Sequence, residues 1–306
     1  MSRVSGTVKI ASIALFLLAP LDWAKAAESQ VFIFWDTVSP DGKYALGWST
    51  SGSLDADDLA GDTNSDDSEL KNGLVDVAAR KMLLVLSGAH YWVLPPDGTH
   101  PNHYSMSTVW SDDSASLLAI YDWRYGTDQV YLVDVKTMRV KKVTDDLQNA
   151  FYQVVRDKAA PYYRKYKKEY SIEFSDPWFV GRDRFEVSGS TFVSKFDDSS
   201  VAFALTFQFA PASKLSAIKS EKLDENAQES DDRQLNRAYR SLIGLLTPDE
   251  RKALVDEERA WIGQRDAVKD EQAQANLVEA RIKTLNDRCE AKIDALRAAD
   301  GEKVAK

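Results

Sequence analysis

The 306-residue sequence has a single cysteine and three histidines. One cysteine cannot form an intramolecular disulfide, and it excludes zinc sites built from several cysteines. Basic charge is also scarce: 39 Lys and Arg side chains face 48 Asp and Glu side chains, which gives a net charge of −9. Because nucleic-acid binding needs a basic surface, nucleic acid is excluded as the main partner.

Signatures of enzyme active sites and metal sites are also lacking. We find no nucleophile elbow, glycine-rich phosphate loop or zinc-protease helix. His100 and His103 form an H-x-x-H pair, but they lie in a proline-containing loop without a recognisable third ligand. The seven acidic residues of 55–69 miss the glycine and glutamate positions of a calcium loop, so we expect a solvated loop. We therefore assign no catalytic residue, no metal site and no cofactor, and interpret the protein as a non-enzyme.

The N-terminal residues 1–26 have the pattern of a secretory signal peptide. Arg3 and Lys9 precede an apolar run over 10–21, and Ala24-Lys25-Ala26 fits the cleavage site. A membrane anchor is the alternative, but the run is shorter than the roughly 20 residues that a spanning helix needs. Cleavage would leave 36 basic and 47 acidic side chains, a net charge of −11. We expect an acidic periplasmic or secreted protein with no membrane span.

Residues 27–213 read as a β-rich domain with an internal repeat. The turn Ser39-Pro40-Asp41-Gly42 is matched by Ser111-Asp112-Asp113, and Leu74-Val75-Asp76-Val77 recurs letter for letter as Leu132-Val133-Asp134-Val135. A weaker third copy is expected over 185–209. Such units resemble propeller blades, but two or three cannot close a propeller, which needs at least four. We expect propeller-like antiparallel hairpins that stay open; an unrelated α+β sheet with chance repetition is the alternative.

A helical pattern over 147–170 interrupts this region, and Pro161 should break it. Tyrosines alternate there with arginine and lysine, which would suit an anionic glycan or a phosphate. The simpler interpretation is a helix whose tyrosines pack on the sheet.

The composition changes after residue 213. Residues 214–232 lose their aromatic side chains and predict an acidic linker, and residues 233–300 have a helical period. Thr247-Pro248-Asp249-Glu250 has the pattern of a capping box at a helix start. Cys289 lies on an apolar stripe of the last helix, so we expect a buried thiol. The predicted fold is therefore α+β: antiparallel β, then a small helical bundle or hairpin.

Residues 233–298 resemble the LprI-type lysozyme inhibitor family. The segments Leu235-Asn236-x-x-Tyr239 and Glu258-Arg259-Ala260-Trp261-Ile262-x-x-Arg265-Asp266-Ala267 are similar to its LN-x-x-Y and QRAW-[IL]-x-[FY]-RDA signatures. Glu258 stands where the family has glutamine and Lys269 where a cysteine is common, so the family's disulfide bracing is not expected. The resemblance implies that the following residues form the functional motif, by packing or by binding: Leu235, Asn236, Tyr239, Arg259, Trp261, Arg265 and Asp266.

The resemblance also implies an exported protein that binds lysozyme and blocks a muramidase sterically. Lysozymes are often basic, yet residues 233–306 carry 15 basic and 14 acidic side chains, a net charge of +1. Electrostatic steering by the helical module is therefore not expected. The alternative function is a cell-envelope scaffold or interaction protein that binds a protein or a glycan through its β domain. The oligomeric state is not indicated by the sequence.

Overall fold

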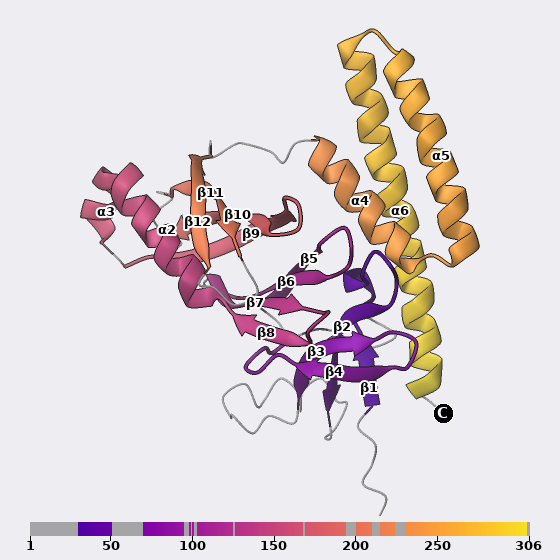
Figure 1. The fold of residues 1–306 in the computed structure, drawn as a ribbon, viewed down its shortest axis with the longest axis horizontal. Coiled ribbons are helices and arrows are strands. Elements are labelled where there is room, and N and C mark those ends of the chain that lie inside the picture. The colour runs from indigo at the N-terminus through magenta and orange to yellow at the C-terminus, as the bar shows by residue number, and fades with distance from the viewer. Residues whose placement is uncertain are drawn as a thin grey trace, which may run out of the picture.

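The computed structural model describes residues 30–304 except 51–69, 95–97, 99, 101–102, 125, 168, 194–199, 210–214 and 224–230. The expected signal peptide and acidic loop lie outside the described residues. Three four-stranded antiparallel sheets are followed by three helices (Figure 1), and none of the sheets closes on itself. The predicted order, antiparallel β followed by helices, is confirmed.

Each sheet is a meander in which neighbours in sequence are neighbours in space. The first comprises β1 (Gln30–Ile33), β2 (Tyr44–Thr50), β3 (Lys71–Asp76) and β4 (Lys81–Val85), with the short 3-10 helix η1 (Trp35–Thr37) after β1. The second comprises β5 (Tyr104–Trp110), β6 (Ser116–Trp123), β7 (Gly126–Asp134) and β8 (Arg139–Lys142). The third comprises β9 (Ser171–Phe179), β10 (Arg184–Phe192), β11 (Ala202–Gln208) and β12 (Ser216–Lys222).

The two strong copies of the sequence repeat form equivalent turns in the first two sheets. Ser39 Oγ donates to Asp41 Oδ1 at 2.7 Å, and Ser111 Oγ donates to Asp113 Oδ1 at 2.9 Å. In each copy the same serine hydroxyl accepts the first backbone N–H of the next strand. Such side-chain bonds fix the backbone of a turn. The third copy falls on β10 and β11, and its turn lies mostly outside the described residues. The likeness to a propeller stays a prediction.

The predicted helical stretch consists of two helices, α2 (Thr144–Lys158) and α3 (Ala160–Tyr166), with the break just before Pro161. Phe151 is fully buried against the third sheet, and the tyrosines of α3 are partly buried beside it. The third sheet and these helices thus share one core, as the packing interpretation expects.

The interpretation of 214–232 as a linker is wrong over its first half, because Ser216–Lys222 pair with β11 as β12. All but one of the β12 side chains are exposed. A strand at the edge of a sheet can be held by backbone hydrogen bonds alone, so its composition can resemble that of a linker.

The C-terminal helices are α4 (Asp231–Leu245), α5 (Pro248–Ala267) and α6 (Glu271–Val304). α4 and α6 are not separate from the sheets, because they share a hydrophobic core with the first one. Helix side chains in this core include Leu242, Leu285 and Cys289, packed with Ala45 and Val75 of the sheet. Cys289 is a free, buried thiol as predicted, and burial raises its pKa to about 11. Among the described residues, no helix combines the length and apolar character needed to cross a membrane.

One polar and one steric feature complete this contact. Near the C-terminal end of α6, the buried Asp300 carboxylate accepts from Trp35 Nε1 and Arg80 Nη1, both at 2.9 Å. Gly244 of α4 lies so close to the first sheet's turn that a Cβ there would be 2.8 Å from the Ser39 carbonyl oxygen. The helix can therefore pack at this distance only with glycine at this position.

We expect Gly244→Ala to lower the free energy of unfolding by about 1–3 kcal/mol, because the added methyl group must push α4 away from the turn. The matched control is Gly263→Ala in α5, where a Cβ would meet nothing within 4 Å. That change should stabilise the protein by up to about 1 kcal/mol through helix propensity. Urea denaturation of both variants measures the difference, and an equal effect of the two changes would contradict the close packing of α4.

Candidate functional site

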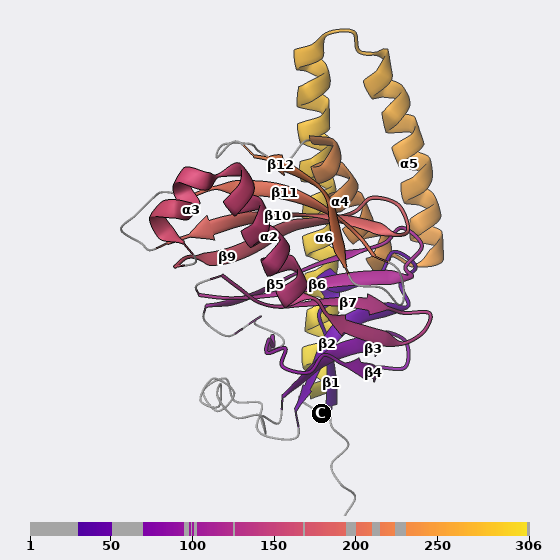
Figure 2. The ribbon, with the colours of Figure 1, turned by 60° about the vertical axis from the view of Figure 1, so that its left-hand side comes forward.

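The helices α5 and α6 form a hairpin that extends beyond the β body (Figures 1 and 2). α5 begins at the predicted capping box: the Thr247 backbone N–H donates to Glu250 Oε2 at 2.8 Å, and the Glu250 N–H donates to Thr247 Oγ1 at 3.4 Å. The box satisfies backbone donors that the first turn of a helix leaves unpaired. From Leu285 to Leu296, α6 packs on the core shared with the first sheet, whereas nearer its N-terminus it pairs with α5 through Arg281.

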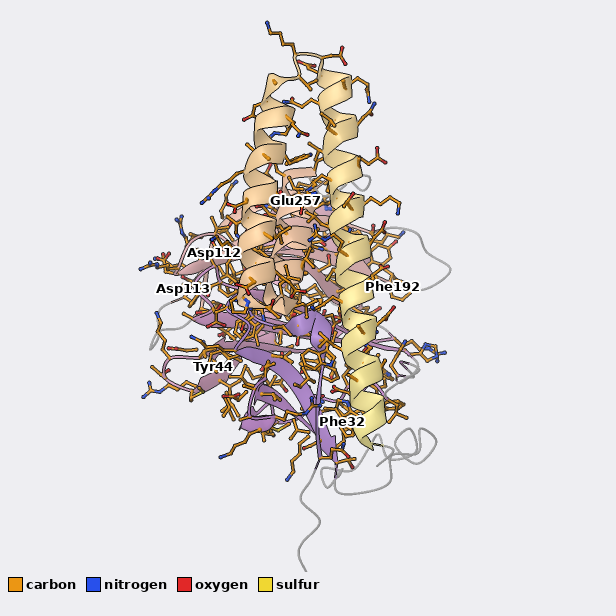
Figure 3. The ribbon with its side chains drawn as sticks, turned by 90° about the vertical axis from the view of Figure 1, so that its right-hand side faces the viewer. Phe32, Tyr44, Asp112, Asp113, Phe192 and Glu257 are labelled. Carbon is orange, nitrogen blue, oxygen red and sulfur yellow. The ribbon has the colours of Figure 1, made fainter. Side chains whose placement is uncertain are left out.

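A cluster of ion pairs joins the two helices of the hairpin. Arg281 of α6 is 8% exposed; its Nη1 lies 2.7 Å from Glu257 Oε1 and its Nε lies 2.8 Å from Glu258 Oε1. Arg288, further along α6, also binds Glu257, at 2.9 Å. Glu257 lies between the helices in Figure 3. Partial burial acts to raise the pKa of Glu257, but the guanidinium groups of Arg281 and Arg288 hold this pKa below its usual range. Glu258 is the residue that departs from the family's glutamine, and here it supplies a charge to this cluster.

The first part of the sequence motif serves packing. Leu235 and Tyr239 of α4 lie against the core shared with the first sheet. Asn236 is exposed, and its side-chain amide donates to the Asp232 carbonyl oxygen at 2.7 Å.

The second part of the motif lies on the hairpin. Leu254, Trp261 and Val268 are spaced by seven residues, but only Leu254 is buried, and Trp261 and Val268 are partly exposed. The Arg265 guanidinium lies over the Trp261 ring at 5.5 Å and forms an ion pair with Asp266 at 2.8 Å. The fold thus divides the motif residues between the core shared with the first sheet and the exposed part of the hairpin. Arg259 is exposed and is paired with a neighbouring aspartate on its own helix.

One exposed apolar residue of the hairpin was not among the expected motif residues. Ile262, next to Trp261, is 42% exposed and adds apolar surface to this part of α5. Ile262 lies within the segment that resembles the family signature, but only the structure shows that its side chain is exposed on α5.

A cleft of about 390 Å³ lies elsewhere, where the helices meet the sheets. Its walls are η1 with the turn that follows it, the strands β5 and β9, and the helix α4. The charged residues that line it are Asp36, Asp122, Glu173, Asp176, Arg237 and Arg240.

Both arginines of the cleft form ion pairs with aspartates. Arg240 pairs with Asp112 and Arg237 with Asp176. Burial raises the pKa of Asp122 to about 6; the Thr127 hydroxyl opposes the shift and the Glu173 carboxylate adds to it.

Among the described residues, no group of three histidine, cysteine or carboxylate side chains is placed to hold a metal ion. His103 instead contacts Arg124 at 3.0 Å.

Residues 216–300 match the family model of the lysozyme inhibitor LprI. The match covers β12 and the helices α4, α5 and α6 up to Asp300, so the resemblance noted in the sequence is confirmed. Comparison with curated proteins gave no match. The LprI-like module therefore begins inside the third sheet and ends at the carboxylate that fastens α6 to the first.

We expect Arg281→Met to lower the free energy of unfolding by about 2–4 kcal/mol, because it leaves the Glu257 and Glu258 carboxylates without their shared cation between two helices. Lys283→Met removes an exposed lysine that pairs within α6, with Asp287, and serves as the control. Urea denaturation followed by circular dichroism measures both variants. A loss no larger for Arg281→Met than for the control would show that the cluster does not hold the hairpin together.

The raised pKa of Asp122 predicts a pH dependence. Its folded-state pKa of about 6 exceeds the usual 3.8, so between these values the folded protein retains a proton that the unfolded chain has lost. The contribution of this group to stability therefore falls as the pH rises through that window. We expect Asp122→Asn to gain in Tm relative to the native protein between about pH 4 and about pH 7. The matched control is Asp128→Asn, at an exposed aspartate of β7. A profile of Asp122→Asn that runs parallel to that of the native protein would contradict the assignment.

Proposed function

We propose that the protein is an exported, non-enzymatic binding protein that inhibits a muramidase by steric binding through the α5–α6 hairpin. The observation that carries this proposal is the match of residues 216–300 to the lysozyme inhibitor family. The N-terminal segment 1–26, with its signal-peptide pattern, supports a location outside the cytoplasm, where a muramidase would be met.

The shape of the hairpin supports a steric mechanism. Its far end extends past the sheets, so it can approach a concave partner before the β body does (Figure 2). On this part of α5, Trp261, Ile262 and Arg265 form a contact surface. Tryptophan and arginine are the residue types that dominate binding energy at protein interfaces, especially when an exposed aliphatic side chain adds apolar area.

The charge of the module indicates how binding would be driven. The helices carry almost balanced charge over 233–306, a net of +1. A partner of either sign would gain little association rate from this module. Affinity would then come from shape and apolar contact at the hairpin.

A second candidate is a cell-envelope scaffold that binds a protein or glycan through its β region. The cleft of about 390 Å³ between α4 and the strands β5 and β9 favours it, since cavities of this size commonly hold ligands. The two candidates use different residues, so point substitutions separate them. Removal of the whole helical module would not, because it would expose the core that α4 and α6 share with the first sheet.

The experiment is an assay of lysozyme activity on a peptidoglycan suspension with the purified chain lacking residues 1–26. We expect inhibition at micromolar concentration, and a loss of about tenfold or more in potency for Ile262→Asp, which places a charge in the contact surface. Ile218→Asp is the matched control, because Ile218 is 50% exposed on β12, away from the hairpin. If the native chain fails to inhibit at micromolar concentration, the proposal is wrong; equal loss in both variants would move the contact away from α5.

A further inference from the structure

The cleft between the sheets and α4 is bounded by two strand edges. β5 is the end strand of the second sheet and β9 is the end strand of the third. Among the described strands, β5 pairs only with β6 and β9 only with β10. The two strands lie next to one another with α4 alongside (Figures 1 and 2).

Two runs of consecutive residues in the lining show that the cleft adjoins these edges, although Asp122 of the inner strand β6 also lines it. Five consecutive residues of β5, 106–110, and six consecutive residues of β9, 173–178, line it. Successive side chains of a strand point to opposite faces, so a cavity over one face would be lined by alternate residues. Continuous lining places the cavity beside the edge, where the backbone N–H and C=O groups of the strand lack a neighbouring strand.

The cleft also offers polar groups without partners. Ser107 Oγ of β5 and Arg240 Nη1 of α4 are buried atoms with no hydrogen-bond partner in the structure. Asp122 and Glu173 add two carboxylates whose mutual repulsion is part of the rise in the pKa of Asp122. A buried donor without a partner is costly, so a ligand that supplies an acceptor to Arg240 and a cation to the carboxylates would be bound favourably.

The aromatic side chains of the cleft do not favour a sugar. Trp110 is 6% exposed, and its indole N–H donates to the Thr37 carbonyl oxygen at 2.7 Å. The ring of Trp178 is covered by the Arg240 guanidinium at 4.3 Å. Trp110 is thus buried and one face of Trp178 is occupied by a cation, whereas an unpaired strand edge suits a peptide backbone.

We propose that this cleft binds a short extended peptide segment with a basic side chain, which adds as a strand to the free edge of β5. The peptide backbone pairs with β5, its basic group lies between Asp122 and Glu173, and a peptide carbonyl oxygen accepts from Arg240. Addition of a strand to an open sheet edge takes its affinity from the backbone and its specificity from alternate side chains. The cleft shares no residue with the exposed surface of the hairpin, so this proposal stands independently of lysozyme inhibition.

The test uses the full chain without residues 1–26 and a fluorescein-labelled, end-blocked hexapeptide of alternating valine and lysine. Fluorescence polarisation should show saturable binding that weakens roughly tenfold in Glu173→Gln. The matched control is Glu221→Gln, the same change on β12, an edge strand outside the cleft. Binding should persist in the control and be lost when alternate amides of the peptide are N-methylated, because methylation removes the donors on one edge.

Several results would overturn the proposal. Binding that is as strong for a valine–glutamate hexapeptide, or that is unchanged in Glu173→Gln, would remove the role of the acidic pair. Binding that survives N-methylation would exclude strand addition. Saturable binding of a chitin hexasaccharide that is lost in Glu173→Gln but not in the control would make the cleft a glycan site. Absence of peptide binding at millimolar concentration would show that the proposal is wrong.

Discussion

The packing of α4 and α6 against the first sheet is the contact on which both proposed binding surfaces depend. It combines an apolar core, the close approach of Gly244 to the turn after η1, and the buried Asp300 carboxylate held by Trp35 and Arg80. Helices of this length gain most of their stability from tertiary packing and not from propensity. Without this contact, α6 would have no fixed direction and α4 would not form a wall of the cleft.

The two surfaces that result differ in physical character. The hairpin projects from the β body (Figure 1), and it is held together by Arg281 and two glutamates from the neighbouring helix. The cleft is concave, has carboxylates from the second and third sheets, and is bounded by strand edges. A rigid projecting element suits a partner with a groove, while an open strand edge suits an extended chain. The two proposals thus use different surfaces of the molecule, and α4 forms a wall of the cleft.

Much of the local structure could be predicted because it depends on residues close in sequence. The capping box of α5, the break before Pro161 and the paired serine–aspartate turns all form within a few residues, and all were found where the sequence placed them. Prediction failed where the signal was not local. β12 has exposed side chains on both faces, so its composition resembles a linker, and only its hydrogen bonds to β11 make it a strand. Trp261 follows Leu254 by two helical turns, yet its ring stays partly exposed, with the Arg265 guanidinium over it.

The sequence by itself determined the order of the elements, the repeated β units and the likeness of the C-terminal segment to lysozyme inhibitors, because periodicity, turn residues and a linear motif are all written along the chain. The tertiary structure alone decided that the helical module shares its core with the first sheet and that the motif is divided between packing and an exposed surface. It also decided that two strand edges and two arginines enclose a cleft. These features join residues that are far apart in the chain, and their contacts are set by packing between elements, which a local pattern does not encode.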